Sequence, residues 1–96
     1  MYKIKTTRGF ERDVKRCCKR GLTISELRQV MLLLERDGSL PAIYRPHKLT
    51  GDRRGQWECH IEPDWLLIWE QYDDELVLIM INTGSHSDLF SKKYRR

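Results

Sequence analysis

The chain has 96 residues, a length that fits one domain, so we expect residues 1–96 to form a single folded unit. Hydrophobic residues make up 40% of the chain and charged residues 33%, a composition that excludes an intrinsically disordered protein. The 18 Lys and Arg residues exceed the 14 Asp and Glu residues, which gives a net charge of +4. This charge favours a polyanionic partner such as RNA or an acidic protein. Because the basic residues are dispersed along the chain, they can equally be solvated surface.

A short strand and a helix are predicted at the N-terminus. Residues 2–5 alternate between polar and apolar side chains, which is the pattern of a strand. Phe10, Val14 and Cys17 then recur at helical spacing before Gly21, so the first helix is expected to end there.

The second helix carries clearer signals. Thr23 is followed three residues later by Glu26, which is the pattern of a capping box, and the helix is expected to end near Gly38. One apolar stripe lies along this helix and is expected to face the core: Ile24, Leu27, Val30, Met31 and Leu34.

The second half of the chain has the period of β-strands. Residues 56–61 alternate, with Trp57, Cys59 and Ile61 on one face and His60 on the other. Further strands are expected over 65–69 and 76–81, with turns at 62–64 and 73–74, a loop over 52–54, one helical turn over 85–90 and an additional short strand near 44–49. The order β-α-α-β-β-β predicts an α+β fold in which two helices pack on one face of a small, mainly antiparallel sheet.

The cysteines and the apolar runs exclude other classes of protein. Cys17, Cys18 and Cys59 are odd in number and form no C-x-x-C pair, so neither a disulfide framework nor a structural metal site is expected. The longest apolar runs are far too short to cross a bilayer, so no membrane partner is expected. A soluble protein of a reducing compartment is predicted.

The three histidines lie in segments that are expected to converge on one end of the sheet. They are His47, His60 and His86, and histidine is the side chain best suited to exchange protons at neutral pH. The turn at 62–64 is expected to bring Asp64 next to His60, where the carboxylate can orient or charge the imidazole. Cleavage of RNA without a metal needs a base for the 2′-hydroxyl, stabilisation of the phosphorane and an acid for the 5′-oxygen. Histidines, a carboxylate and nearby cations suffice for that chemistry.

Binding of RNA can be assigned to cations and aromatic rings near these histidines. Phosphate contacts are assigned to Lys48, Arg53, Arg54 or the basic cluster at residues 92–96, and base stacking to Trp65 or Phe90. Trp57 shares a strand face with Cys59 and Ile61 and is expected in the core instead. Each candidate also has a structural interpretation, because strand-end histidines are usually surface residues, an aspartate can serve only the turn, and tryptophans are more often core.

Three segments resemble the YafQ branch of the RelE/ParE toxin superfamily. They are residues 47–51, 55–69 and 83–90, and His-Ile-Glu-Pro-Asp-Trp in the second is the most specific part. The resemblance covers nearly the whole chain, because residues 40–44 and the two upstream helices also fit. It implies a RelE-like fold and a cytoplasmic toxin of a bacterial toxin–antitoxin pair. It further implies that this toxin is an endoribonuclease that needs no cofactor and cuts mRNA in the ribosomal A site. A DinJ-like antitoxin is the implied partner that silences it.

The resemblance also implies roles for individual residues. His47, His60, Asp64 and His86 match the family's acid–base set, with His86 as the principal proton-transfer residue. Trp65 and Phe90 match positions that help to place the substrate. The family often has an arginine at the end of the last strand where this chain has Asn82. Phosphate stabilisation must then come from another cation, or activity is reduced.

Two alternatives remain open at this point. A ParE-like protein has the same fold and poisons DNA gyrase without cutting nucleic acid, and a fold alone does not decide between these functions. The histidines favour cleavage. A basic RNA-binding protein that has kept the fold and lost the chemistry is the second alternative, and Asn82 is the only sign of it.

Overall fold

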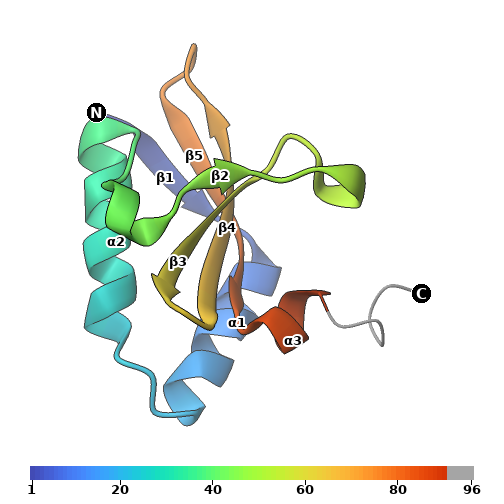
Figure 1. The fold of residues 1–96 in the computed structure, drawn as a ribbon. Helices are drawn as coiled ribbons and strands as arrows, with labels where there is room; N and C mark the ends of the chain where they lie inside the picture. Colours follow the sequence, from blue (N-terminus) through green and yellow to red (C-terminus); the bar gives the residue numbers. More distant parts are fainter. Residues whose placement is uncertain (91–96) are drawn as a thin grey trace.

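The computed structural model describes residues 1–90 of the chain. A five-stranded sheet lies at the centre, with α1 and α2 to its left and below it in Figure 1 and α3 at the lower right. The elements in chain order are β1 (Lys3–Thr6), α1 (Arg8–Lys19), α2 (Ile24–Asp37), the 3₁₀ turn η1 (Ala42–Tyr44), β2 (His47–Lys48), the 3₁₀ turn η2 (Gly51–Arg53), β3 (Trp57–Glu62), β4 (Trp65–Tyr72), β5 (Val77–Gly84) and α3 (His86–Phe90).

The sheet has the strand order β1-β5-β4-β3-β2. β1 runs parallel to β5, and the remaining neighbours are antiparallel. The predicted α+β class, the mainly antiparallel sheet and the two covering helices are therefore confirmed. The additional strand expected near residues 44–49 is present as the two-residue β2, and the expected helical turn after the last strand is α3.

The helices begin and end where their sequences direct. Thr7 caps α1, because its hydroxyl accepts a hydrogen bond from the Phe10 backbone N–H at 3.1 Å. α2 ends at Gly38, which adopts a left-handed conformation with φ 66°. The capping box predicted at Thr23 is wrong in detail: Thr23 is the N-cap of α2, but its side chain makes no capping hydrogen bond.

One face of the sheet packs against the helices and forms the core. Its fully buried members include Leu34 and Val30 from α2, Cys17 from α1 and Leu67 from β4. Cys59 in β3 is also buried there, and this burial raises the pKa of its thiol to about 12. No helix within residues 1–90 is long and apolar enough to cross a membrane.

Candidate active site on the sheet face opposite the helices

Strand register places the candidate residues in two neighbouring rows. Directly opposed residues share a face of a sheet. His47 in β2 pairs with Glu58 in β3, Glu58 pairs with Ile68 in β4, and Ile68 pairs with Asn82 in β5. The next row along the strands runs from His60 in β3 to Leu66 in β4 and Gly84 in β5.

Register shifts break the pairing in both rows. One lies between His60 and Glu62, and the other lies beside Ile68. Such irregularities change the direction in which neighbouring side chains point, and they are common beside active sites. The convergence of histidines predicted from the sequence is therefore present: the ring centroids of His47 and His60 are 6.3 Å apart, and those of His60 and His86 are 5.7 Å apart.

Glu58 links two of the histidines. Its side chain is 7% exposed, and its Oε1 lies 3.1 Å from Nε2 of His47 and 3.8 Å from Nε2 of His60. A buried carboxylate needs partners of this kind, because an unpaired charge away from water is costly. Nδ1 of His47 lies 2.9 Å from the carbonyl oxygen of Arg45, which can only accept a hydrogen bond. The His47 ring can thus donate from Nδ1 and face the carboxylate with Nε2, and this cluster can hold or release a proton.

His86 has its own carboxylate. Oδ1 of Asp64 accepts a hydrogen bond from the His86 backbone N–H at 2.9 Å and lies 2.6 Å from Nδ1 of the His86 ring. These two bonds hold the pKa of the Asp64 carboxyl below its ordinary value. Because a carboxylate only accepts, Nδ1 must carry a proton, and Nε2 is left to exchange a proton with a substrate.

The N-terminus of α3 fixes the position of His86. The Ser85 N–H donates to Asp88 at 2.9 Å and the Asp88 N–H donates to the Ser85 hydroxyl at 3.1 Å, which is a reciprocal cap on the first turn. Arg20, the C-cap of α1, binds the same carboxylate through both terminal nitrogens. Arg20 and Ser85 together hold the pKa of Asp88 well below its ordinary value. Gly84 leaves room for this arrangement, because an added Cβ would lie 2.7 Å from Oδ2 of Asp88.

Two sequence predictions about this region are wrong. Asp64 was expected to orient His60, but it binds His86, because the turn directs its carboxylate toward the first residue of α3. Trp65 was expected to stack on a base, but it is 1% exposed and its indole N–H donates to the Thr83 hydroxyl at 2.9 Å. Trp65 lies on the same face of β4 as Leu67 and Trp69, and this face packs in the core.

Trp57 is more accessible than its core assignment predicted. It is only partly buried, its ring stacks on Trp69 with centroids 6.1 Å apart, and the ammonium group of Lys48 lies 5.6 Å from the ring. Glu58 is the residue that the sequence predictions missed. It alternates with Trp57 and Cys59 along β3 and so shares a face with His60. A carboxylate on the same strand face as a candidate histidine was the available signal.

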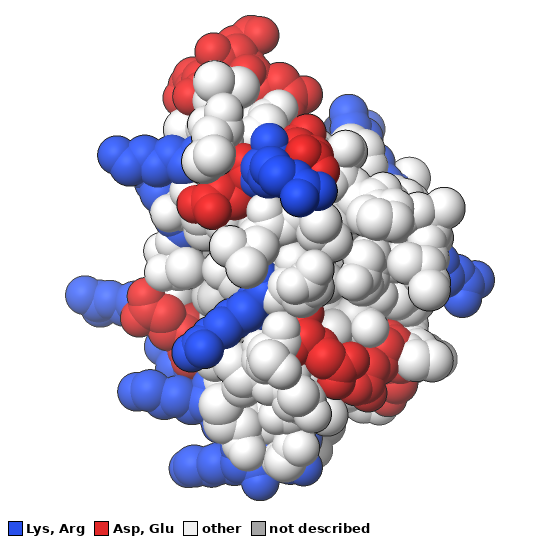
Figure 2. All heavy atoms as spheres, turned by 90° about the vertical axis from the view of Figure 1, so that its left-hand side faces the viewer, with Lys and Arg blue, Asp and Glu red and all other residues white. Residues whose placement is uncertain are grey.

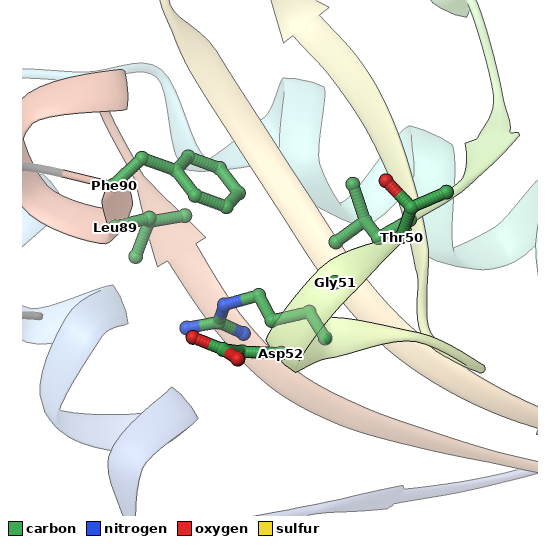
Figure 3. Close-up of a pocket in the computed structure, with 7 residues that line it drawn as sticks. Thr50, Gly51, Asp52, Leu89 and Phe90 are labelled. Carbon is green, nitrogen blue, oxygen red and sulfur yellow. The ribbon is translucent and has the colours of Figure 1, made fainter.

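A cavity of about 490 Å³ lies between the loop after β2 and the end of α3. Figure 3 shows Thr50, Gly51 and Asp52 on one side of it and Leu89 and Phe90 on the other. Arg53 also lines it, with its guanidinium carbon 5.6 Å from the centre of the Phe90 ring. The structure thus brings Arg53 and Phe90 together, whereas Arg54 is exposed and Asn82 lies in the row with Glu58.

No group of three His, Cys, Asp or Glu side chains within residues 1–90 is arranged to hold a metal ion. The basic cluster at residues 92–96 lies outside the described residues. On the face that carries α2, acidic groups gather at the end where the β4–β5 turn lies and again in the lower half, and basic side chains project along the left-hand side (Figure 2).

Comparison with known proteins identifies the family. Residues 2–91 match the family model described as the bacterial toxin of the type II toxin–antitoxin system, YafQ. The chain belongs to the YafQ toxin family. It is 38% identical over 82 residues to the mRNA interferase toxin YafQ of Escherichia coli K12, an alignment that covers 84% of this chain and 87% of that protein.

Solved structures of similar toxins have the same fold. The toxin in the E. coli DinJ–YafQ complex superimposes with a TM-score of 0.85 at 35% identity, over 94% of this chain and 99% of that chain. A metal-bound toxin from Helicobacter pylori superimposes with a TM-score of 0.85 at 34% identity, over 94% of this chain and 100% of that chain. The predicted family and RelE-like fold are confirmed, and the predicted enzyme class agrees with the activity for which the E. coli relative is named.

Proposed function

We propose that this YafQ-family toxin, as one domain spanning residues 1–96, is a ribosome-dependent endoribonuclease that cleaves mRNA by acid–base catalysis. One observation carries the proposal. Two separate groups that can transfer protons, Glu58 with His47 and His60, and His86 with Asp64, lie side by side on one face of the sheet. Transesterification of RNA needs one group to accept a proton and another to donate one.

The first group acts on the nucleophile. Glu58 and the histidines beside it accept the proton of the 2′-hydroxyl, and the freed oxygen forms a bond to the adjacent phosphorus. The bond from phosphorus to the 5′-oxygen then breaks, and His86 donates a proton to that oxygen through Nε2. The products are a 2′,3′-cyclic phosphate and a 5′-hydroxyl, and the catalytic groups exchange their protons with water afterwards.

The environments of the two groups suit these roles. Glu58 is buried and His60 is nearly so, at 16% side-chain exposure, whereas His86 is 54% exposed. Glu58 contacts both imidazoles, so a proton taken from the substrate can be shared within this cluster. An exposed, carboxylate-bound imidazole can reach a leaving group and be reprotonated from solvent.

Partners follow from the family. The E. coli structure is described as a complex of DinJ with YafQ, and we propose a DinJ-like antitoxin as the partner that silences this chain. The net charge of +4 suits both an acidic antitoxin and the RNA of a ribosome. Action on translating ribosomes would place the protein in the cytoplasm.

The test is primer extension on mRNA from translating ribosomes that have been incubated with the purified protein. Discrete cuts within codons that leave 5′-hydroxyl ends are expected. A 2′-deoxy nucleotide at the cut position should abolish cleavage there, because it removes the nucleophile. Intact mRNA together with arrested DNA gyrase complexes would contradict the proposal and support a ParE-like poison.

A further inference from the structure

Arg53 is held by side chains from three other parts of the chain. Its Nη1 donates to Oε1 of Gln56 at 3.1 Å and to Oδ1 of Asn82 at 3.2 Å, and its guanidinium carbon lies 5.6 Å from the centre of the Phe90 ring. Both protons of Nη1 are therefore in use. Within residues 1–90, neither Nε nor Nη2 of Arg53 has a hydrogen-bond partner. These two nitrogens form one edge of the guanidinium, and that edge can bind two oxygens of a phosphate.

The charge of Arg53 is also uncompensated. The other two arginines of the neighbouring cavity are paired, Arg16 with Asp13 at 3.0 Å and Arg20 with Asp88. Arg53 has no carboxylate within ion-pair distance among the described residues, although Asp52 lines the same cavity from an exposed position. A half-buried, immobilised cation without a partner charge is suited to an anionic ligand.

Asn82 is oriented so that it can only accept from Arg53. Its Nδ2 donates to Oδ2 of Asp13 at 3.0 Å, and the Thr83 backbone N–H donates to the same oxygen at 3.1 Å. Asp13 is 7% exposed and also binds Arg16. Because a carboxylate accepts only, the amide nitrogen of Asn82 must face Asp13, and its oxygen must face Arg53.

The position of Asn82 places Arg53 opposite the candidate base. Asn82 and Glu58 belong to one cross-strand row and are separated by β4, which corresponds to about 10 Å between their strands. Ile68 lies between them and is fully buried. A phosphodiester above Ile68 would have Glu58 and its histidines on one side and Arg53 on the other.

We propose that Arg53, positioned by Asn82 and Asp13, binds the phosphate that is attacked during cleavage and stabilises its developing negative charge. The proposal rests on the proposed ribonuclease function and assigns its phosphate-binding residue. Arg53 touches the reacting group, whereas Asn82 and Asp13 act through it as positioning residues.

The test compares Arg53→Ala with Arg28→Ala, which removes the same charge from an exposed position on α2. Single-turnover cleavage of ribosome-bound mRNA should fall by about 10² to 10³ in Arg53→Ala, as expected for loss of a preorganised donor at the transition state, and less than threefold in the control. Binding of a 2′-deoxy-substituted RNA oligonucleotide, which is not cleaved, gives an independent readout. A plot of the logarithm of its binding constant against the logarithm of the salt concentration should be shallower by about 0.7 in Arg53→Ala and unchanged in the control. A difference of this size corresponds to one phosphate contact on a single strand.

Asn82→Ala tests the positioning role. It should slow cleavage in the wild-type background and have no further effect on an Arg53→Ala protein, whereas a purely structural role would slow both equally. Equal rates and equal salt slopes for Arg53→Ala and Arg28→Ala would overturn the inference. A wild-type protein that does not cut, but whose salt slope still depends on Arg53, would contradict the ribonuclease proposal and support Arg53 as a phosphate ligand.

Discussion

Asp64→Asn should slow cleavage through His86 while leaving the fold intact. The substitution keeps the shape of the side chain and removes the charge that faces Nδ1 of His86 at 2.6 Å. A hydrogen bond to a charged group contributes about 1.5 to 3 kcal/mol, and about 1.4 kcal/mol corresponds to a factor of ten in rate. The side chains of His86 and Asp64 are 54% and 69% exposed, so water competes for both and we expect a loss near tenfold. His86→Ala should cost about 10² to 10⁴.

The assay is single-turnover cleavage of ribosome-bound mRNA by both single variants and by the double variant. Because Asp64 acts through His86, Asp64→Asn should add almost nothing to His86→Ala. Asp64→Asn and His60→Ala should multiply, because the structure pairs His60 with Glu58 and not with Asp64. Melting temperatures should stay close to wild type, since exposed charge pairs contribute little to stability. Multiplicative losses for Asp64 and His86, with overlapping losses for Asp64 and His60, would refute this assignment.

Three further results are expected. Trp65→Ala should lower the free energy of unfolding by about 3 to 5 kcal/mol, and Trp57→Ala should lower it less, because only Trp65 is fully buried; equal urea midpoints would contradict this. Asp88→Asn should lower the free energy of unfolding at neutral pH, and the difference from wild type should shrink as the pH falls below about 4. The reason is that the lowered pKa of Asp88 stabilises the folded state only while the carboxyl is ionised. A difference that is constant down to about pH 2 would exclude the Arg20 contact as its cause. Treatment of the purified toxin with a chelator that is removed before the ribosomes and their Mg²⁺ are added should leave cleavage unchanged, since the proposed proton transfers use side chains alone; a loss that an added transition metal restores would show that an ion takes part.

The parts of the fold that local patterns determine were predictable from the sequence. Gly38 ends α2 and the period-2 alternation defines β3, because capping and side-chain alternation act within a few residues. The face that Trp65 occupies was harder to predict, although Trp65 shares a face of β4 with the core residues Leu67 and Trp69. All five residues of the run 65–69 are apolar and buried, and such a run does not show by itself which of its two faces packs against the helices.

The candidate site was predictable in its residue types and not in its pairing. His47, His60 and His86 do lie close together. β2 pairs with β3, and Gly84, two residues before His86, lies in one cross-strand row with His60. Which carboxylate binds which ring depends on contacts between distant segments. Asp64 reaches His86 because Arg20 and Ser85 fix the start of α3 through Asp88. The spacing of Ser85 and Asp88 is a local signal for a helix cap. The contacts of Asp88 with Arg20 and of Asp64 with His86 join distant segments and leave no local signal.

The central claim, that His86 protonates the leaving oxygen, is tested most directly by changing that oxygen. In an mRNA with one 5′-phosphorothiolate linkage at the cut position, sulfur replaces the 5′-oxygen and leaves as a thiolate without needing a proton. His86→Ala should then cleave at nearly the wild-type rate, while Glu58→Gln should stay slow, because the 2′-hydroxyl still has to lose its proton. An equal deficit of His86→Ala on the oxygen and the sulfur substrates would contradict the claim.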